Sequence, residues 1–300
     1  MSELVQRFLA GDRRALSQAL SAVENEKPEA LGLLQAVRER RGRARVIGIT
    51  GAAGTGKSTL ISALLRVLRR RGLGVGVLAV DPSSPLSGGA VLGDRIRMAE
   101  HDLDSGVFVR SLASRGELGG LSRQAFRLVD VMDAFGFDVV LLETVGTGQS
   151  EVAVVEAAPT RLVVLAPGLG DEIQALKAGI LEIADRFAVT KADLPDAERT
   201  AAVLRSLVPQ PVHLVSARKG EGLDALADAL LAEATPGRGD ALARMRRLLA
   251  TEVGRLAKTL AENAPDLAKL AEAVDRGERD LASAAREVMK NLARRRESPR

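Results

Sequence analysis

Short apolar runs alternate along the chain with longer stretches in which apolar residues are spaced three or four positions apart. The runs are VIGIT (46–50), VGVLAV (75–80), VFVR (107–110), DVVLLE (138–143), RLVVLA (161–166), RFAVT (186–190) and VHLV (212–215). Strands that are apolar along their whole length and alternate with helices are typical of a parallel sheet covered on both faces. The pattern therefore predicts an α/β fold with a mainly parallel sheet between two layers of helices.

Both ends of the chain have helical spacing and no strand pattern. Within residues 1–45, Gly11 and Asp12 mark a break and a helix cap. After residue 235 the spacing predicts a helix with one apolar face, which either packs against the main domain or forms a subunit interface. We expect a helical extension over residues 1–45, a main domain over 46–234 and a C-terminal helical segment over 235–300. The predicted apolar face consists of Leu242, Met245, Leu249, Val253, Leu256 and Leu260.

The composition narrows the classes of protein. The chain has 300 residues, 46% of them hydrophobic, and no cysteine, which excludes disulfides, thiolate metal sites and a cysteine nucleophile. It shows no apolar run of membrane-spanning length and no secretory signal, so we expect a soluble cytoplasmic protein. The formal charge of +4 comes with six Phe and no Trp or Tyr, which removes most of the surface on which nucleic-acid bases stack. We expect neither a nucleic acid nor a membrane as a partner.

A glycine-rich segment, GITGAAGTGKSTL (48–60), lies between the first apolar run and a predicted helix. It matches the pattern G-x-x-x-x-G-K-[ST], in which backbone N–H groups and a helix N-terminus surround phosphate groups. Lys57 is predicted to neutralise the β and γ phosphates of a nucleotide, and the Ser58 hydroxyl to bind Mg²⁺. The segment therefore predicts a P-loop nucleotide-binding domain. The predicted nucleotide-binding residues of the loop are Gly51, Gly54, Thr55, Gly56, Lys57, Ser58 and Thr59.

An acidic residue follows another apolar run, in VVLLETVG (139–146). Glu143 stands three residues before Gly146, and switch GTPases have a motif of this form, usually with Asp in place of Glu, that serves the metal and senses the γ phosphate. By itself, a Glu at a strand end or a Gly in a turn is an ordinary feature. Behind a phosphate loop, the two predict a second group on the metal side of the site.

The segment TKAD (190–193) follows the run RFAV and has the form [NT]-K-x-D that recognises guanine. The Asp193 carboxylate can accept hydrogen bonds from N1–H and the exocyclic amine of guanine, whereas adenine would leave this buried charge unpaired. The Lys191 stem can lie along the base. After the run VHLV, the segment formed by Ser216, Ala217 and Arg218 can bring a backbone N–H to the guanine carbonyl. These residues predict that the ligand is GTP or GDP rather than ATP.

Longer segments carry a more specific resemblance. They are AVDPSSPLSGGAVLGDRIRM (79–98), RSLASRGELGGLS (110–122), GFDVVLLETVGTGQSEVAV (136–154), APGLGDEIQALKAGILEIADRFAVTKAD (166–193) and GERDLASAA (277–285). With the phosphate loop, they resemble the MeaB/ArgK family of P-loop GTPases, the auxiliary proteins of adenosylcobalamin-dependent acyl-CoA mutases such as methylmalonyl-CoA mutase. The block that begins DPSS and the segment ETVGTGQSE are the specific part, because generic P-loop proteins do not have them.

The resemblance implies roles for particular residues. Lys57 contacts the γ phosphate, while Asp81, Asp94 and Glu143 form the acidic set around Mg²⁺ and the attacking water, with Ser58 as a further metal ligand. From the residues alone, Asp81 is a carboxylate at a strand end close to phosphates, where a metal is needed to tolerate it. Asp94 would fit a surface helix equally well.

Two positions depart from the family pattern. Thr190 stands where the family usually has Asn, which removes an amide contact that braces the phosphate loop and affects affinity rather than base identity. Gln149 comes three residues after Gly146 instead of directly after it, so the attacking water lacks an obvious holder. We therefore expect slow intrinsic hydrolysis that a partner raises by ordering the site.

The leading hypothesis is a GTPase chaperone that gates cofactor loading of an acyl-CoA mutase and protects the mutase from inactivation. The C-terminal helices suggest a homodimer, through the apolar face and through the resemblance. Three alternatives stay open. A metal-insertion GTPase of hydrogenase or urease maturation would need Cys and His ligands, and this chain has no cysteine and only His101 and His213. A kinase or transport ATPase conflicts with TKAD, and a nucleotide-gated scaffold would protect the mutase even without turnover.

Overall fold

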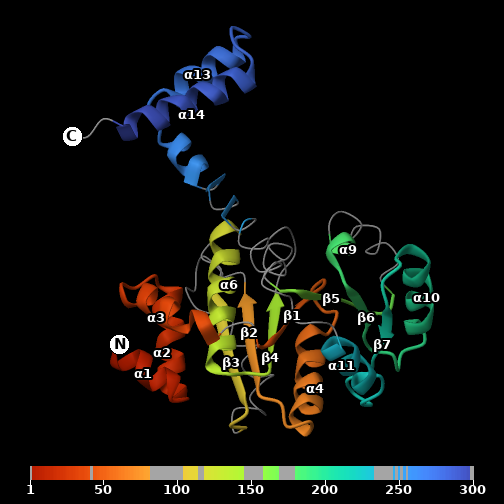
Figure 1. Ribbon diagram of the computed structural model, residues 1–300. Helices are drawn as coiled ribbons and strands as arrows, with labels where there is room; N and C mark the ends of the chain where they lie inside the picture. Colours follow the sequence, from red (N-terminus) through yellow and green to blue (C-terminus); the bar gives the residue numbers. More distant parts are fainter. Residues whose placement is uncertain are drawn as a thin grey trace. The chain divides into compact units, whose positions relative to one another are not determined.

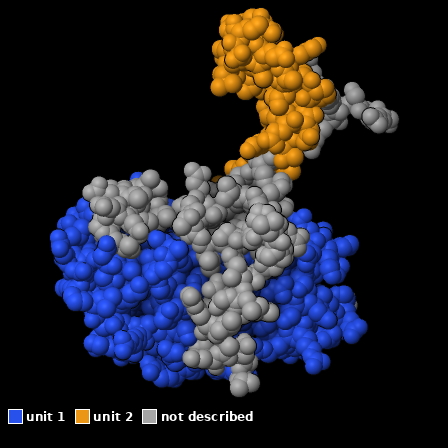
Figure 2. Space-filling model, turned by 180° about the vertical axis from the view of Figure 1, so that it is seen from behind, with its two compact units in different colours: residues 1–241 blue, residues 242–300 orange. Residues whose placement is uncertain are grey.

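The structure, a computed structural model, is shown in Figure 1. For Asp81, the structure describes the backbone but not the side chain. The chain forms two compact units, Met1–Ala241 and Leu242–Arg300, which Figure 2 distinguishes by colour. The expected boundaries near residues 45 and 235 remain predictions. The described residues are 2–40, 43–81, 104–113, 118–144, 158–168, 180–232, 246, 249–250, 253–254 and 256–297.

Seven parallel strands form one sheet in the first unit, which confirms the α/β prediction. The order is β3-β2-β4-β1-β5-β6-β7, so β1 lies between β4 and β5 (Figure 1). In open parallel sheets of this kind, ligands bind outside the carboxyl ends of the strands where the order reverses. Each predicted apolar run forms one strand. The strands are β1 (Arg45–Thr50), β2 (Val75–Asp81), β3 (Val107–Ala113), β4 (Val139–Thr144), β5 (Thr160–Leu165), β6 (Arg186–Val189) and β7 (Val212–Leu214).

Helices cover both faces of this sheet, as the continuous apolar runs require. α4 (Lys57–Arg70) and α11 (Leu223–Ala232) share a buried core with Ile47 and Ile49 of β1. Val46 of β1 points the other way and packs in the core that contains α6 (Leu118–Phe135). α10 (Ala197–Leu207) packs against β6 and β7, and the short α9 (Ile180–Ile183) lies next to β5.

The N-terminal helices belong to the core of the first unit. They are α1 (Glu3–Leu9), α2 (Arg13–Glu24) and α3 (Glu29–Val37), followed by the 3₁₀ turn η1 (Arg38–Arg40). Asp12 caps α2 as predicted, because its side chain accepts from the backbone N–H groups of the first turn. From β3, Arg110 donates to Glu24 Oε2 at 2.6 Å and to Ser21 Oγ at 3.1 Å. The last turn of α2 is therefore fixed to an edge strand of the sheet.

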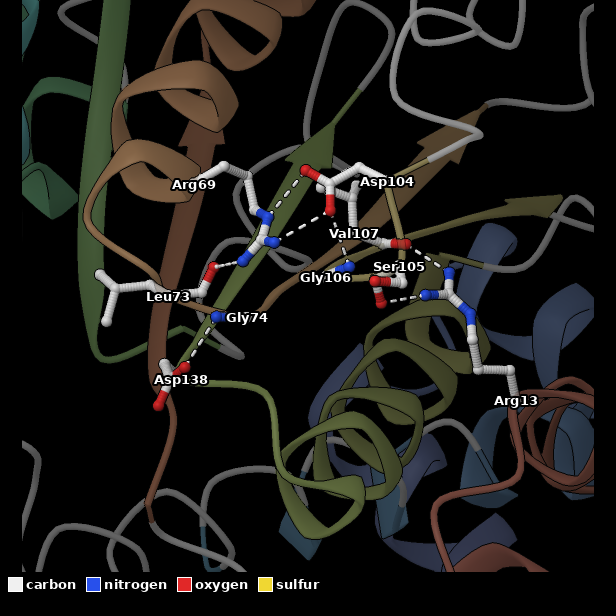
Figure 3. A network of polar contacts seen from close by, with 9 residues as sticks. All are labelled: Arg13, Arg69, Leu73, Gly74, Asp104, Ser105, Gly106, Val107 and Asp138. Carbon is white, nitrogen blue, oxygen red and sulfur yellow. Dashed lines mark hydrogen bonds and ion pairs between the residues drawn. The ribbon is translucent and has the colours of Figure 1, made fainter.

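A network of polar contacts joins the amino ends of β2 and β3 (Figure 3). Arg69, in the last turn of α4, donates to both carboxylate oxygens of Asp104 at 2.8 and 2.9 Å and to the Leu73 carbonyl at 2.6 Å. A Cβ on Gly106 would lie 2.0 Å from the Arg69 guanidinium carbon, so this residue must be small for the guanidinium to pack here. The helix that begins at the phosphate loop is thus held at its far end as well.

Arg13, the first residue of α2, reaches the edge strand β3. Its guanidinium donates to the carbonyls of Ser105 and Val107 (Figure 3). It also lies over the Phe108 ring, 5.6 Å from the ring centroid. The Gly106 carbonyl between them accepts instead from a backbone N–H of β2. Because successive carbonyls of a strand point to opposite sides, Arg13 binds the two that face away from the sheet.

The second unit is helical, with α13 (Leu267–Asp275) and α14 (Leu281–Glu297) packed together. Asn291 of α14 donates to Asp266 before α13 at 2.6 Å. Of the predicted apolar face, Leu242 and Met245 lie outside the described residues. No helix among the described residues is long and apolar enough to cross a membrane. The described members of the face, Leu249, Val253, Leu256 and Leu260, are between 42% and 62% exposed.

Candidate nucleotide site

The phosphate loop lies where the sequence predicts it, between the end of β1 at Thr50 and the start of α4 at Lys57. Gly51 has φ of +144°, and a Cβ there would lie 2.1 Å from the backbone carbonyl oxygen of Val164 in β5. Gly56 precedes the helix in a left-handed conformation. The loop therefore turns directly against the neighbouring strand, and only glycine permits this approach.

Lys57 is 7% exposed, and its ammonium lies inside the loop that precedes it. Nζ donates to the Gly51 carbonyl at 2.6 Å and to the Ala52 carbonyl at 3.0 Å. The Thr55 hydroxyl donates to the same Ala52 carbonyl at 2.9 Å, which closes the loop on itself. A buried ammonium needs such partners, and this one stands at the N-terminus of α4, where phosphate groups bind well.

Ser58 and Glu143 meet at the metal side of the site. The Ser58 hydroxyl, in the first turn of α4, donates to Glu143 Oε1 at 2.8 Å. Glu143 is completely buried in β4, next to β1. A hydroxyl and a carboxylate provide the oxygen ligands that Mg²⁺ prefers, so these two residues fit such an ion.

The other predicted metal-side residues are placed only in part. The Asp81 backbone ends β2, which pairs with β4 so that Ala79 lies opposite Glu143. The Asp81 side chain, Asp94, Gly146 and Gln149 lie outside the described residues. Among the described residues, no three His, Cys, Asp or Glu side chains are grouped as a metal site would require.

The predicted base-reading residues come together at the carboxyl ends of β6 and β7. The Ser216 hydroxyl donates to Asp193 Oδ1 at 2.7 Å, and the Lys219 N–H donates to the Ser216 hydroxyl at 3.2 Å. The hydrogen bond from Ser216 is the main cause that lowers the pKa of Asp193 below its usual value. Asp193 therefore stays ionised and oriented, as an acceptor for two neighbouring N–H groups must be. Ala217 and Arg218 follow in the turn, half-buried and exposed respectively.

Thr190 joins the base-reading segment to the phosphate loop. Its hydroxyl lies 2.5 Å from the Thr55 carbonyl and 3.0 Å from the Leu165 carbonyl, and Lys191 Nζ donates to the Gly54 carbonyl at 3.2 Å. The sequence predicts the loss of a bracing contact where Thr replaces Asn. In the structure, the threonine hydroxyl reaches the loop and supplies a brace of its own.

Sequence reasoning missed a pair of buried residues at the same edge of the sheet. Thr50 and Thr144 end β1 and β4, and their hydroxyl oxygens are 3.0 Å apart. The signal was present, because each threonine closes an apolar run just before a loop of the predicted site.

Of the predicted phosphate-loop residues, Thr59 alone has an exposed side chain on α4.

A matched pair of glycine substitutions tests the loop geometry. Gly51→Ala should lower the free energy of unfolding by about 3 kcal/mol or more, because its Cβ collides with the Val164 carbonyl in a backbone that resists side chains. Gly54→Ala is the control: its φ is +78°, but no atom lies within 4 Å of the added Cβ, so about 1 kcal/mol is expected. Denaturant unfolding measures both, and equal midpoints would contradict the close approach.

Comparisons with known proteins agree with this site. The family described as "Methylmalonyl Co-A mutase-associated GTPase MeaB" matches residues 16–264. A relative from Pyrococcus horikoshii is 50% identical over 200 residues, which cover 67% of this chain and 63% of the relative. The mouse protein "Methylmalonic aciduria type A homolog, mitochondrial" is 36% identical over 265 residues, covering 77% of this chain and 64% of that protein. Both matches span less than two thirds of the relative's length.

A solved structure supports the same grouping. The "Crystal structure of LAO/AO transport system kinase" has a TM-score of 0.70 and 25% sequence identity, over 97% of both chains. The family match covers the phosphate loop, Glu143 and the TKAD segment, which the structure brings to one edge of the sheet. This chain belongs to the family of methylmalonyl-CoA mutase-associated GTPases, MeaB.

Proposed function

We propose that this chain binds GTP and hydrolyses it to GDP and phosphate. The observation that carries the proposal is the assembly of two halves of one site. The phosphate loop with Lys57 and the guanine-type acceptor Asp193 are joined through Thr190 and Lys191. The family to which the chain belongs supports the same activity.

Positively polarised groups would bind the phosphates of the nucleotide, and a carboxylate would bind its base. The backbone N–H groups at the start of α4 and the Lys57 ammonium would hold the β and γ phosphates and stabilise the negative charge that shifts during phosphoryl transfer. Asp193, kept ionised by Ser216, would accept from N1–H and the amine of guanine. A nucleotide held at both of these ends would be fixed along its length.

We include Mg²⁺ in the proposal, held by Ser58 and Glu143 together with the predicted ligands Asp81 and Asp94. A bound Mg²⁺ would neutralise charge on the phosphate oxygens. Glu143 supports this assignment, because a completely buried carboxylate beside a phosphate loop would otherwise repel the phosphates. The Ser58 hydroxyl keeps Glu143 aimed at this side of the loop.

The proposed partner is an adenosylcobalamin-dependent acyl-CoA mutase of the methylmalonyl-CoA type. We propose that nucleotide turnover gates loading of the cofactor and protects the mutase from inactivation. The family description, which names association with methylmalonyl-CoA mutase, supports this part. Because Gln149 comes three residues after Gly146 instead of directly after it, we propose that a partner that orders the site accelerates hydrolysis.

We also propose that the chain forms a homodimer through the apolar face of the second unit. Leu249, Val253, Leu256 and Leu260 are exposed at positions three or four apart. An exposed apolar stripe of this kind is typical of an interaction surface. A second copy of the chain presents the same stripe, so the two faces could cover each other.

A kinase or transport ATPase is the main competing function, because one similar solved structure is that of an "LAO/AO transport system kinase". The Asp193 carboxylate, oriented by Ser216, argues against adenine. A metallochaperone of hydrogenase or urease maturation has less support. The chain has no cysteine, and His213 is half-buried in β7, where burial lowers its pKa.

Base specificity gives the first test. Calorimetry with Mg²⁺ should show GDP binding with about micromolar affinity and ADP binding at least about 100-fold weaker, because adenine leaves Asp193 unpaired. Asp193→Ala should abolish the preference. Asp196→Ala, an exposed carboxylate three residues later, should preserve it. ADP that binds as well as GDP would return the kinase or ATPase function to first place.

Partner stimulation gives the second test. GTP turnover should be slow for the isolated protein and rise at least about ten-fold, with a ceiling of about 10³–10⁵, when methylmalonyl-CoA mutase from the same genome is added. Lys57→Ala should remove turnover under both conditions. Fast turnover that the mutase leaves unchanged would contradict the chaperone proposal while preserving the GTPase.

Sedimentation gives the test of the dimer. The wild-type chain should sediment as a dimer, and the double variant Leu256→Asp, Leu260→Asp should shift toward the monomer because it buries charge in the apolar face. Lys258→Asp, an exposed residue between them, is the charge control and should leave the dimer intact. Removal of residues 240–300 should also give a monomer, and a dimer that survives it would exclude this interface.

A further inference from the structure

Two threonines occupy positions where an apolar residue would fit the surroundings. Thr50 ends β1 and Thr144 ends β4, and they are 0% and 2% exposed. The strands pair in parallel with Ile49 opposite Glu143, so the two threonines end the strands side by side. Valine has the same shape and suits a strand as well, so the presence of hydroxyl groups at these two buried positions needs an explanation.

The hydroxyl groups satisfy each other. The Thr144 and Thr50 hydroxyl oxygens are 3.0 Å apart, and the Ile49 carbonyl is 3.5 Å from the Thr144 hydroxyl. A buried hydroxyl is unfavourable without a partner, whereas a bonded pair in a dry site is directional and fixes the separation of the two strands. The pair therefore ties the last residue before the phosphate loop to the residue after Glu143.

The opposite face of the same two strand ends carries the metal-side contact. Successive side chains of a strand point to opposite faces, so Glu143 faces α4 and meets Ser58, while Thr144 faces the core that contains Leu142 and α6. The end of β4 is thus bonded to β1 through Thr144 on one face and to α4 through Glu143 on the other. Loss of the threonine pair would leave Thr50, the last residue before the phosphate loop, beyond the end of the backbone ladder that pairs Ile49 with Glu143.

We propose that Thr50 and Thr144 are positioning residues that set the distance between the phosphate loop and Glu143, and so the strength with which Mg²⁺ promotes nucleotide binding. The inference rests on the proposed function and deepens it. It assigns the pair to the Mg²⁺-dependent part of binding and to turnover, and not to recognition of guanine, which takes place at the ends of β6 and β7.

The test uses the full chain and isosteric variants. Thr50→Val and Thr144→Val each remove one hydroxyl, Thr144→Ser keeps it, and Thr160→Val changes another buried threonine at the amino end of β5. GDP affinity is measured by calorimetry with Mg²⁺ and with EDTA, GTP turnover by phosphate release, and stability by thermal unfolding.

The two valine variants should each reduce the gain in GDP affinity that Mg²⁺ provides about ten-fold, since one unsatisfied buried hydroxyl is of that order. In EDTA, their GDP affinity should stay within about two-fold of the wild type. In Mg²⁺, kcat should fall, and KM for GTP should rise in step with the lost Mg²⁺-dependent affinity, because KM follows Kd when hydrolysis is slow. Thr144→Ser and Thr160→Val should keep the Mg²⁺ dependence of the wild type. The double variant Thr50→Val, Thr144→Val should regain thermal stability, because an apolar pair replaces a polar one, but keep the Mg²⁺ defect.

Three results would overturn the inference by itself. The first is a pair of valine variants with the Mg²⁺ dependence of the wild type, whatever their thermal stability, since the hydroxyl groups would then serve the fold alone. The second is a double variant that recovers the Mg²⁺ dependence together with stability. A wild-type chain that binds GDP equally with Mg²⁺ and EDTA would overturn it too, without touching base recognition. A wild type that binds no GDP would instead overturn the proposed function along with it.

Discussion

The close approach of Gly51 to the Val164 carbonyl is the contact on which the nucleotide site depends. It directs the chain out of β1 across the end of β5, so that the following residues wrap around Lys57 and enter α4. The same turn places the Thr55 carbonyl within reach of Thr190 beyond β6. The phosphate half and the base half of the site are therefore assembled by backbone geometry at one edge of a parallel sheet, where all strands end together.

Two buried ionisable groups of opposite sign are stabilised by that assembly. The Lys57 ammonium donates to carbonyls of its own loop. Ser58, the residue after Lys57, donates its hydroxyl to the Glu143 carboxylate. Neighbours on the helix, these two residues face different parts of the site. A nucleotide with its metal ion would enter between a fixed cation and a fixed anion, which suits a ligand whose phosphates and metal carry opposite charges.

Much of the fold could be predicted from the sequence, because each strand and cap depends on local pattern. All seven apolar runs became strands, and Asp12 caps α2. The phosphate loop and the Asp193–Ser216 pair also follow from short motifs with a physical basis. What could not be predicted depends on partners distant in the sequence: the reach of the Thr190 hydroxyl, the threonine pair, and the contact of Arg13 with β3 are fixed only when separate elements pack. The sequence also predicted a contact to be lost that the structure contains. Thr190, in place of the usual Asn, suggested that the phosphate loop loses a brace, because one motif position does not reveal that the Thr55 carbonyl lies within reach of the hydroxyl.

The contact of Arg13 with the carbonyls of Ser105 and Val107 also decides how the sheet can meet other chains. An edge strand with unpaired carbonyls is a template on which a foreign strand can add. At the start of β3, the carbonyls of Ser105 and Val107 are already engaged by the Arg13 guanidinium, which also lies over the Phe108 ring. The opposite edge strand, β7, has only three residues. At these two places in the described part of the sheet, the occupied start of β3 and the shortness of β7 limit the pairing that a foreign strand can find.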